Sequence, residues 1–238
     1  MNYISLGFNC NVALALRNCK LDKETNVFDW LVSHPKDILN ILKNNIMEFL
    51  KDNINFLLFS LSKQKYLLNK DTKNKIIYDK NTNLIFEHDY DGTFDSIITT
   101  KNKYKRRIIR LKNILAGNNK ILFIFSGKSN HNDYINNSHS ISTLEYKTDC
   151  KEYYLYLQEI SNYLKITYPL LKFHILSFNL YNKFNDFEIE NFTHKFLGNF
   201  TKRKDMENKI YKFLMNIKKN NFNDFNNFNN LKKFISTS

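Results

Sequence analysis

The sequence predicts an α/β fold in which a mixed sheet is covered by helices, with a region of antiparallel strands in the first half of the chain. Three observations lead to this prediction. The chain opens with a strand pattern followed by a helical one, short apolar runs crowd residues 54–90, and helical and strand patterns alternate over residues 101–178. The alternative is an α+β arrangement, in which helices and antiparallel strands are segregated.

The first strand and helix place a cysteine at a helix start. Residues 2–6 form an apolar run that ends at Gly7, and Asn9 is a residue type that caps helices. The apolar positions after Asn9 recur at helical spacing. Cys10 is therefore expected in the first turn of this helix.

Residues 35–90 change from a helical pattern to a strand pattern. A helix is expected from about residue 35 to residue 50, because its apolar residues form one stripe and Ser33 can cap its N-terminus. Short hydrophobic runs follow between residues 54 and 90, separated by turn-forming clusters of Asn, Lys and Asp. These runs predict antiparallel strands.

Beyond residue 100, helices and strands alternate, which is typical of a sheet that is at least partly parallel and is wrapped by helices. The run at residues 121–125 is apolar at every position, as in a strand covered on both faces. The other elements are a basic helix at residues 101–115, an amphipathic helix at 153–164 and a buried strand at 173–178. Residues 128–148 are polar and are expected to form a surface excursion or part of a lid.

The chain is expected to fold as a single domain over residues 1–218, followed by an Asn-rich low-complexity tail at residues 219–238 that is assigned no function. A chain of 238 residues is long enough to bury a sizeable core. Hydrophobic residues make up 42% of it, with 21 Phe and 14 Tyr, so a packed aromatic interior is available.

The chain is basic, with 36 Lys and Arg against 23 Asp and Glu and a formal net charge of +13. Such a charge raises nucleic acid or an anionic membrane surface as a partner. However, the excess is mostly scattered Lys in a chain rich in Asn, Ile and Tyr, and we interpret it as coding bias plus solubility. A nucleic-acid partner is possible but not favoured. It would bind the basic residues of KYKRRI at 103–108, and such residues more often form the solvated face of a helix. The oligomeric state is left open.

The cysteines indicate a reducing compartment. Cys10, Cys19 and Cys150 are odd in number and show no CxxC spacing, so neither a disulfide framework nor a metal site is expected, and no cofactor motif is present. No apolar run reaches the ~18 to 20 residues of a membrane span, and the N-terminus does not resemble a signal peptide. We therefore expect a cytoplasmic protein without a membrane partner, located in the host cytoplasm if the protein is viral.

Cys10 is the first candidate for chemistry, in the segment ISLGFNC at residues 4–10. The N–H groups at a helix N-terminus are unpaired and partly positive, so they stabilise a thiolate placed there and can also hold an oxyanion. The alternative reading is that Cys10 is a small buried hydrophobic residue.

His88 is the candidate base, in the segment FEHDY at residues 86–90. A cysteine nucleophile needs an adjacent imidazole, which the fold can supply from far along the chain. His88 combines a strand end with an acidic neighbourhood, whereas His174 lies in an apolar run and His194 in a region read as an uncertain helix. The alternative is a structural or surface histidine.

Asp29 is the third candidate, in the segment FDW at residues 28–30. A carboxylate between two large aromatic residues is costly to bury unless it accepts hydrogen bonds. Asp29 is therefore expected to cap a turn or to orient another polar group, and the turn is the commoner of these roles.

Taken in order, ISLGFNC, FDWLVS, FEHDY, and KYKRRI followed by ILFIF make the sequence resemble the putative papain-like cysteine peptidase family over roughly residues 1–126. The resemblance implies a nucleophile and base at Cys10 and His88, a peptide or protein substrate, and either hydrolysis or acyl transfer. It also implies a papain-like α+β sheet, which is the alternative fold. A non-catalytic basic domain that binds nucleic acid or a protein partner is the competing hypothesis.

The residue that orients the imidazole is either Asp29 or Asp89. If residues 84–89 form one regular strand, Asp89 points to the face opposite His88, so Asp29 is favoured. The sequence departs from the family at Phe125 and Ser126, where relatives tend to have an Arg that ends the strand. This departure implies a lost or altered ligand contact, or a member that keeps the fold without catalysis.

Overall fold

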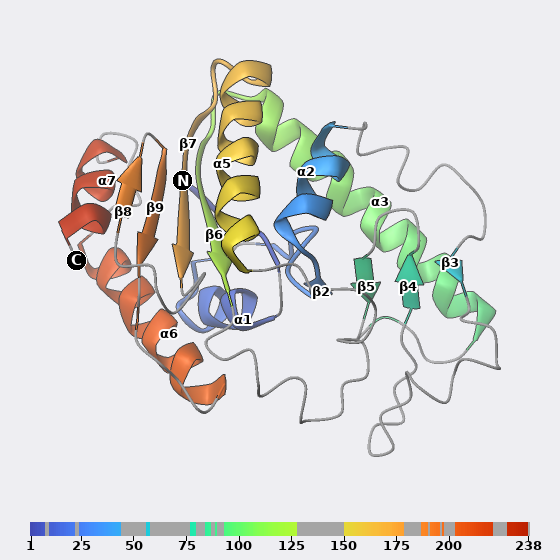
Figure 1. The fold of residues 1–238 in the computed structure, drawn as a ribbon. Helices are drawn as coiled ribbons and strands as arrows, with labels where there is room; N and C mark the ends of the chain where they lie inside the picture. Colours follow the sequence, from blue (N-terminus) through green and yellow to red (C-terminus); the bar gives the residue numbers. More distant parts are fainter. Residues whose placement is uncertain are drawn as a thin grey trace.

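Within the described residues, the main sheet holds five strands in the spatial order β1-β6-β7-β9-β8 (Figure 1). The strands β1, β6, β7 and β9 pair in parallel, and β8 pairs antiparallel with β9 at the edge. Their bounds are β1 Asn2–Ser5, β6 Lys120–Ser126, β7 Lys172–Phe178, β8 Phe187–Ile189 and β9 Phe192–Lys195. The computed structural model describes residues 1–7, 10–21, 24–43, 56–57, 77–79, 84–86, 89, 93–127, 150–178, 187–189, 191–195, 197, 203–220 and 228–237.

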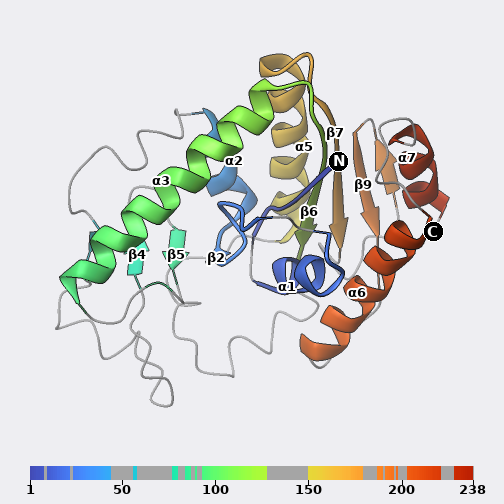
Figure 2. The ribbon, with the colours of Figure 1, turned by 180° about the vertical axis from the view of Figure 1, so that it is seen from behind.

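A second, smaller sheet lies beside the long helix α3, Phe94–Ala116 (Figure 2). Its strand order is β2-β5-β4-β3, and each neighbouring pair is antiparallel. The bounds are β2 Leu31–Val32, β3 Phe56–Leu57, β4 Ile77–Asp79 and β5 Leu84–Phe86.

The expected architecture is therefore wrong. We expected one mixed sheet with an antiparallel region in the first half of the chain, or a papain-like α+β fold. Instead, the four strands that form the body of the main sheet are all parallel, and the antiparallel strands of the first half belong to a separate sheet. Parallel neighbours need a crossover connection, and α5 supplies it between β6 and β7, whereas β4 and β5 are only four residues apart in the chain and pair antiparallel.

Helices cover both faces of the main sheet, as is typical of parallel sheets. One face carries α1, α6 and α7, and the other carries α2, α3 and α5 (Figure 1). The helices not yet bounded are α1 Asn11–Asn18, α2 Pro35–Lys43, α5 Cys150–Thr167, α6 Arg203–Lys219 and α7 Phe228–Thr237. None of the described helices is long and apolar enough to cross a bilayer.

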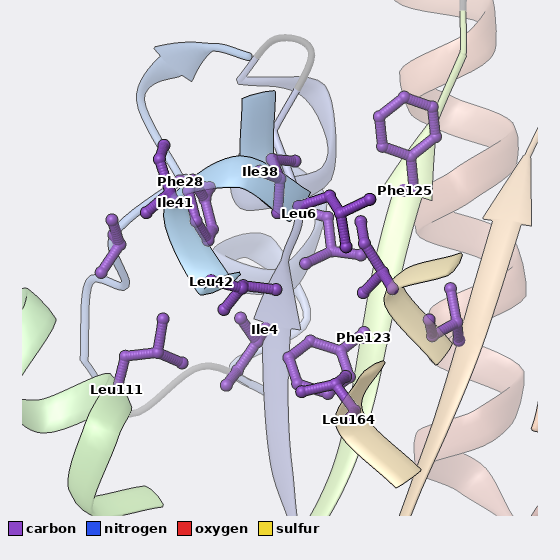
Figure 3. Packing of buried hydrophobic residues seen from close by; sticks show 14 of the residues in the cluster. Ile4, Leu6, Phe28, Ile38, Ile41, Leu42, Leu111, Phe123, Phe125 and Leu164 are labelled. Carbon is purple, nitrogen blue, oxygen red and sulfur yellow. The ribbon is translucent and has the colours of Figure 1, made fainter. Parts of the chain in front are cut away.

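The apolar run of β6 serves both faces of the sheet, because successive side chains on a strand point to opposite sides. Phe123 and Phe125 pack with the residues of α2, α3 and α5, together with Ile4 of β1 (Figure 3). Leu122 and Ile124 pack with those of α1, α6 and α7. Each fully buried side chain of this size contributes about 1.5 to 3 kcal/mol relative to exposure, so β6 is the centre of both cores.

Two segments near the C-terminus differ from expectation. His194 lies on strand β9 and not in a helix. Within the Asn-rich stretch, residues 228–237 form α7, which places Leu231 and Ile235 in the core beside Ile210 of α6. Two apolar residues four positions apart are too weak a pattern to predict a helix. The polar stretch at 128–148 lies outside the described residues.

Candidate active site

The chain leaves β1 through a turn that requires glycine. The N–H of Leu6 donates to the carbonyl of Ile124 at 2.8 Å, which extends the sheet ladder by one residue. Gly7 then has φ +82°, a conformation that L side chains rarely adopt, and a Cβ atom there would lie 1.9 Å from Ser33 Oγ. The absence of a side chain at position 7 therefore allows the segment before α2 to pack against the end of β1.

Cys10 occupies the N-cap position of α1. Its carbonyl accepts the N–H of Leu14 at 2.9 Å, so it lies one position before the first turn in which it was expected. The residue is partly exposed. It follows β1 at the edge of the sheet to which the parallel strands point (Figure 1), and the first N–H groups of α1 lack acceptors within the helix.

Cys19 has a different environment at the other end of the same helix. It is 1% exposed and donates from its sulfur to the carbonyl of Tyr211 at 3.6 Å. Burial, partly offset by Lys218, raises the pKa of the Cys19 thiol to about 11. A thiol kept protonated in this way is a poor nucleophile. The reactivity of Cys10 can therefore be compared with that of Cys19 in the same molecule.

Asp29 lies in the turn between Asn26 and Leu31. Its side chain is buried, and Oδ2 accepts the backbone N–H of Asn26 at 2.6 Å. The same turn contacts β1, since Asn26 Nδ2 donates to the carbonyl of Tyr3 at 3.4 Å. It also lies close to Gly7, because a Cβ atom added at that position would be 3.3 Å from the carbonyl oxygen of Phe28. The structure thus brings the turn that contains Asp29 against the segment that leads to Cys10.

His88 lies outside the described residues, so its pairing with Cys10 stays a prediction. The neighbouring described positions are Phe86, which ends β5, and Asp89. β5 pairs with β2, and Phe86 is opposite Leu31 in that register. The end of β5 is therefore adjacent to the residues that follow Asp29.

Asp89 is held by helix α3. The hydroxyl of Tyr104 donates to Asp89 Oδ2 at 2.8 Å, Lys103 forms an ion pair with Oδ1, and the Thr100 hydroxyl donates to the Asp89 carbonyl at 2.8 Å. The Asp89 side chain is only 4% exposed. Burial and the Asp89 carboxylate raise the pKa of Tyr104, which therefore remains a hydrogen-bond donor.

This contact assigns a role that the sequence did not predict. Tyr104 and Lys103 belong to KYKRRI, and Arg107 of the same segment lies over the Tyr104 ring, 4.8 Å from its centroid. The only signal in the sequence is a tyrosine among basic residues, next to Lys103 and three positions before Arg107. A carboxylate partner elsewhere in the chain cannot be identified from that spacing.

Tyr104→Phe is expected to lower the free energy of unfolding by about 1.5 to 3 kcal/mol, because it removes a hydrogen bond to a buried charged group. The matched control is Tyr163→Phe, which removes a hydroxyl that bonds to neutral groups, since it donates to the carbonyl of Leu42 at 2.8 Å and also contacts Tyr168. That change should cost about 0.5 to 1.5 kcal/mol. Urea denaturation of the three proteins measures the difference, and equal losses would contradict the role of Asp89.

The rest of the basic helix also makes intramolecular contacts. Arg110 forms an ion pair with Glu24 at 2.7 Å and donates to the carbonyl of Thr25 at 3.0 Å. Lys105 and Arg106 are exposed. Because several of its cations are used within the protein, this helix presents less free charge to nucleic acid than its sequence indicates.

At Phe125, where the resemblance implies an arginine, the chain has a buried aromatic side chain. The ring of Phe125 packs edge-to-face on Tyr153 at 5.9 Å between centroids. The hydroxyl of Tyr153 hydrogen-bonds to His34 Nδ1 at 2.7 Å, and burial lowers the pKa of His34 to about 4. Ser126 is buried as well. Phe125 thus contributes to the core in this chain and makes no contact of the kind an arginine would make with an anion.

The described residues contain no group of three or more His, Cys, Asp or Glu side chains arranged to hold a metal ion. Of the residues singled out from the sequence, the structure places Cys10, Asp29 and Asp89, and the contacts above join the first two segments through Gly7.

Comparison with known proteins agrees with the motif order. The sequence profile of the family described as putative papain-like cysteine peptidase matches residues 1–155, which confirms the expected resemblance. The chain is 32% identical over 133 residues to uncharacterized protein R408 of Acanthamoeba polyphaga mimivirus, a match that covers 51% of this chain and 60% of that protein. The match therefore spans less than two thirds of that relative's length. No solved structure matches this chain.

Proposed function

Because this chain belongs to the putative papain-like cysteine peptidase family, we propose that it is a cysteine hydrolase or acyltransferase acting on peptide or protein substrates, with Cys10 as the nucleophile. One observation carries the proposal. Cys10 is a partly exposed thiol at the start of a helix and follows β1 at the edge where α/β sheets bind ligands, whereas Cys19 is buried.

In the proposed reaction, the Cys10 thiolate attacks the substrate carbonyl carbon and forms a carbon–sulfur bond. The N–H groups at the start of α1 stabilise the oxyanion. The imidazolium of His88 gives its proton to the leaving amine as the carbon–nitrogen bond breaks. His88 then takes a proton from water, or from an acceptor amine, which attacks the thioester. The carbon–sulfur bond breaks and releases the Cys10 thiolate, which restores the thiolate–imidazolium pair.

The register of the smaller sheet supports His88 as the base and Asp29 as the residue that orients it. Leu31 pairs with Phe86 in an antiparallel ladder. Asp29 precedes Leu31 by two residues, so its turn leads into the strand paired with the end of β5, and His88 comes two residues after that strand end in the sequence. Asp89 is less suited, since its carboxylate already accepts from Lys103 and Tyr104.

The test is alkylation of the native protein by iodoacetamide, with the rate at each cysteine measured by peptide mass spectrometry. Cys10 is expected to react at least about tenfold faster than Cys19, because a thiolate is the reactive form and burial raises the pKa of Cys19 to about 11. Cys10 should also react faster in the native protein than in urea.

His88→Ala is expected to slow alkylation of Cys10 several-fold. The matched control is His131→Ala, which removes a histidine from the polar stretch and should leave the rate unchanged. The proposal fails if Cys10 reacts at the same rate in the wild type, in His88→Ala and in the urea-unfolded chain.

A further inference from the structure

A pocket of about 550 Å³ is lined by the first residues of β6 and β7. These two strands start at the edge of the main sheet opposite the edge where α1, the helix that follows Cys10, lies (Figure 1). The floor of the pocket contains Lys120 and Lys172, the first residues of these two strands, and Asn191, which precedes β9. The C-terminal end of α5 and the helix α7 supply the walls. Its volume is typical of pockets that bind small molecules.

Four lysines from four different elements line this pocket. Besides Lys120 and Lys172, they are Lys165 from the last turn of α5 and Lys232 from α7. No Asp or Glu is among its described lining residues. A concave site lined by one sign of charge concentrates counter-ions.

Two of the four lysines are positioned by their surroundings. Lys120 is only 6% exposed, although lysine is rarely buried to this extent. Burial and the nearby ammonium of Lys172 lower the pKa of Lys120. Lys232 Nζ donates to Asn191 Oδ1 at 2.7 Å, which fixes the direction of its side chain. The ammonium groups of Lys120 and Lys172 are thus close enough to interact, and Lys232 is oriented by a contact with another residue of the pocket lining.

The remaining lining residues suit the body of an organic ligand. The rings of Tyr168 and Phe173 and the side chain of Leu171 supply an apolar wall, and Asn191 and Asn229 supply amide groups. Pockets for small molecules combine such an apolar lining with a few placed polar groups. A ligand with an anionic end and an uncharged body fits this division.

We propose that this lysine pocket binds a small phosphate-bearing ligand, with the phosphate against Lys120, Lys165, Lys172 and Lys232 and the body of the ligand against Tyr168. Lysine binds phosphate as a compact point charge, and several ammonium groups match the charge of about −2 on a phosphate group better than the single charge of a carboxylate. The length of the seven-residue β6, roughly 20 Å, separates this pocket from the edge that carries Cys10.

The experiment is isothermal titration of the full chain with pyrophosphate and with ATP at low ionic strength. Lys165→Gln/Lys172→Gln changes two exposed lysines of the pocket. This variant is expected to weaken pyrophosphate binding at least about tenfold, equivalent to 1.4 kcal/mol. The control is Lys204→Gln/Lys209→Gln on α6, which removes the same charge from another exposed surface and should change the affinity less than about twofold.

Vesicles identify the source of the phosphate. Competition by phosphatidylcholine vesicles containing phosphatidic acid, and not by phosphatidylcholine alone, would indicate a lipid headgroup, whereas tighter binding of ATP than of pyrophosphate would indicate a soluble ligand. Both outcomes support a phosphate site. The proposal is overturned if pyrophosphate does not bind the wild type, or if the pocket variant and the control bind it equally. Alkylation of Cys10 should be unaffected in both variants, which separates this result from the test of the proposed function.

Discussion

Cys10→Ala is expected to abolish the burst of p-nitrophenol that the wild type should release from p-nitrophenyl acetate. In the wild type, the Cys10 sulfur takes the acetyl group and releases one p-nitrophenolate per active site, after which slower hydrolysis of the thioester sets the steady rate. Removal of the nucleophile should lower the acylation rate by at least about 10³-fold, a loss typical of nucleophile deletions. Stopped-flow absorbance measures both the amplitude and the rate.

Cys19→Ala is the matched control for this experiment. It removes the other cysteine side chain that the structure describes, which is buried at the opposite end of α1 and donates to Tyr211. This variant should keep the full burst amplitude. A wild-type burst that survives in Cys10→Ala, or that is lost in Cys19→Ala with the fold intact, would show that Cys10 is not the nucleophile.

Gly7→Ala is expected to destabilise the protein by about 2 to 4 kcal/mol, the sum of the cost of a left-handed conformation and of overpacking. The φ of +82° and the 1.9 Å approach of Ser33 Oγ to the added Cβ atom are the reasons. For a chain of this size the melting temperature should fall by roughly 5 to 15 °C. Thermal unfolding followed by circular dichroism measures the change.

Gly117→Ala is the control for the substitution at Gly7. Position 117 has no positive φ, and its new Cβ atom would meet the flexible amide end of Asn119. Its cost should be limited to the hydrogen bond from Asn119 Nδ2 to Ile114, about 1 kcal/mol. If the two alanine variants are equally stable, the turn after β1 does not require glycine. The close packing of Ser33 on Gly7 would then not constrain the segment before Cys10.

Much of the candidate site could be predicted from local sequence. The strand, glycine and helix around Cys10 were expected because each depends on residues within one or two turns. The partners of Asp89 could not be predicted. Lys103 and Tyr104 contact it from helix α3, and no pattern among neighbouring residues indicates that contact. Asp29 was expected to cap a turn, and its contact with Asn26 has that form.

The periodicity of the chain by itself determined where the main helices and strands lie, because the alternation of apolar and polar side chains is a property of neighbouring residues. Only the tertiary structure decided which strands share a sheet, since β1 and β6 pair in parallel across more than a hundred residues while β2 and β5 join a separate sheet. It also decided that lysines between residues 120 and 232 line one pocket. Strand pairing and pocket formation depend on long-range packing, and an apolar run carries no information about the partner it will meet.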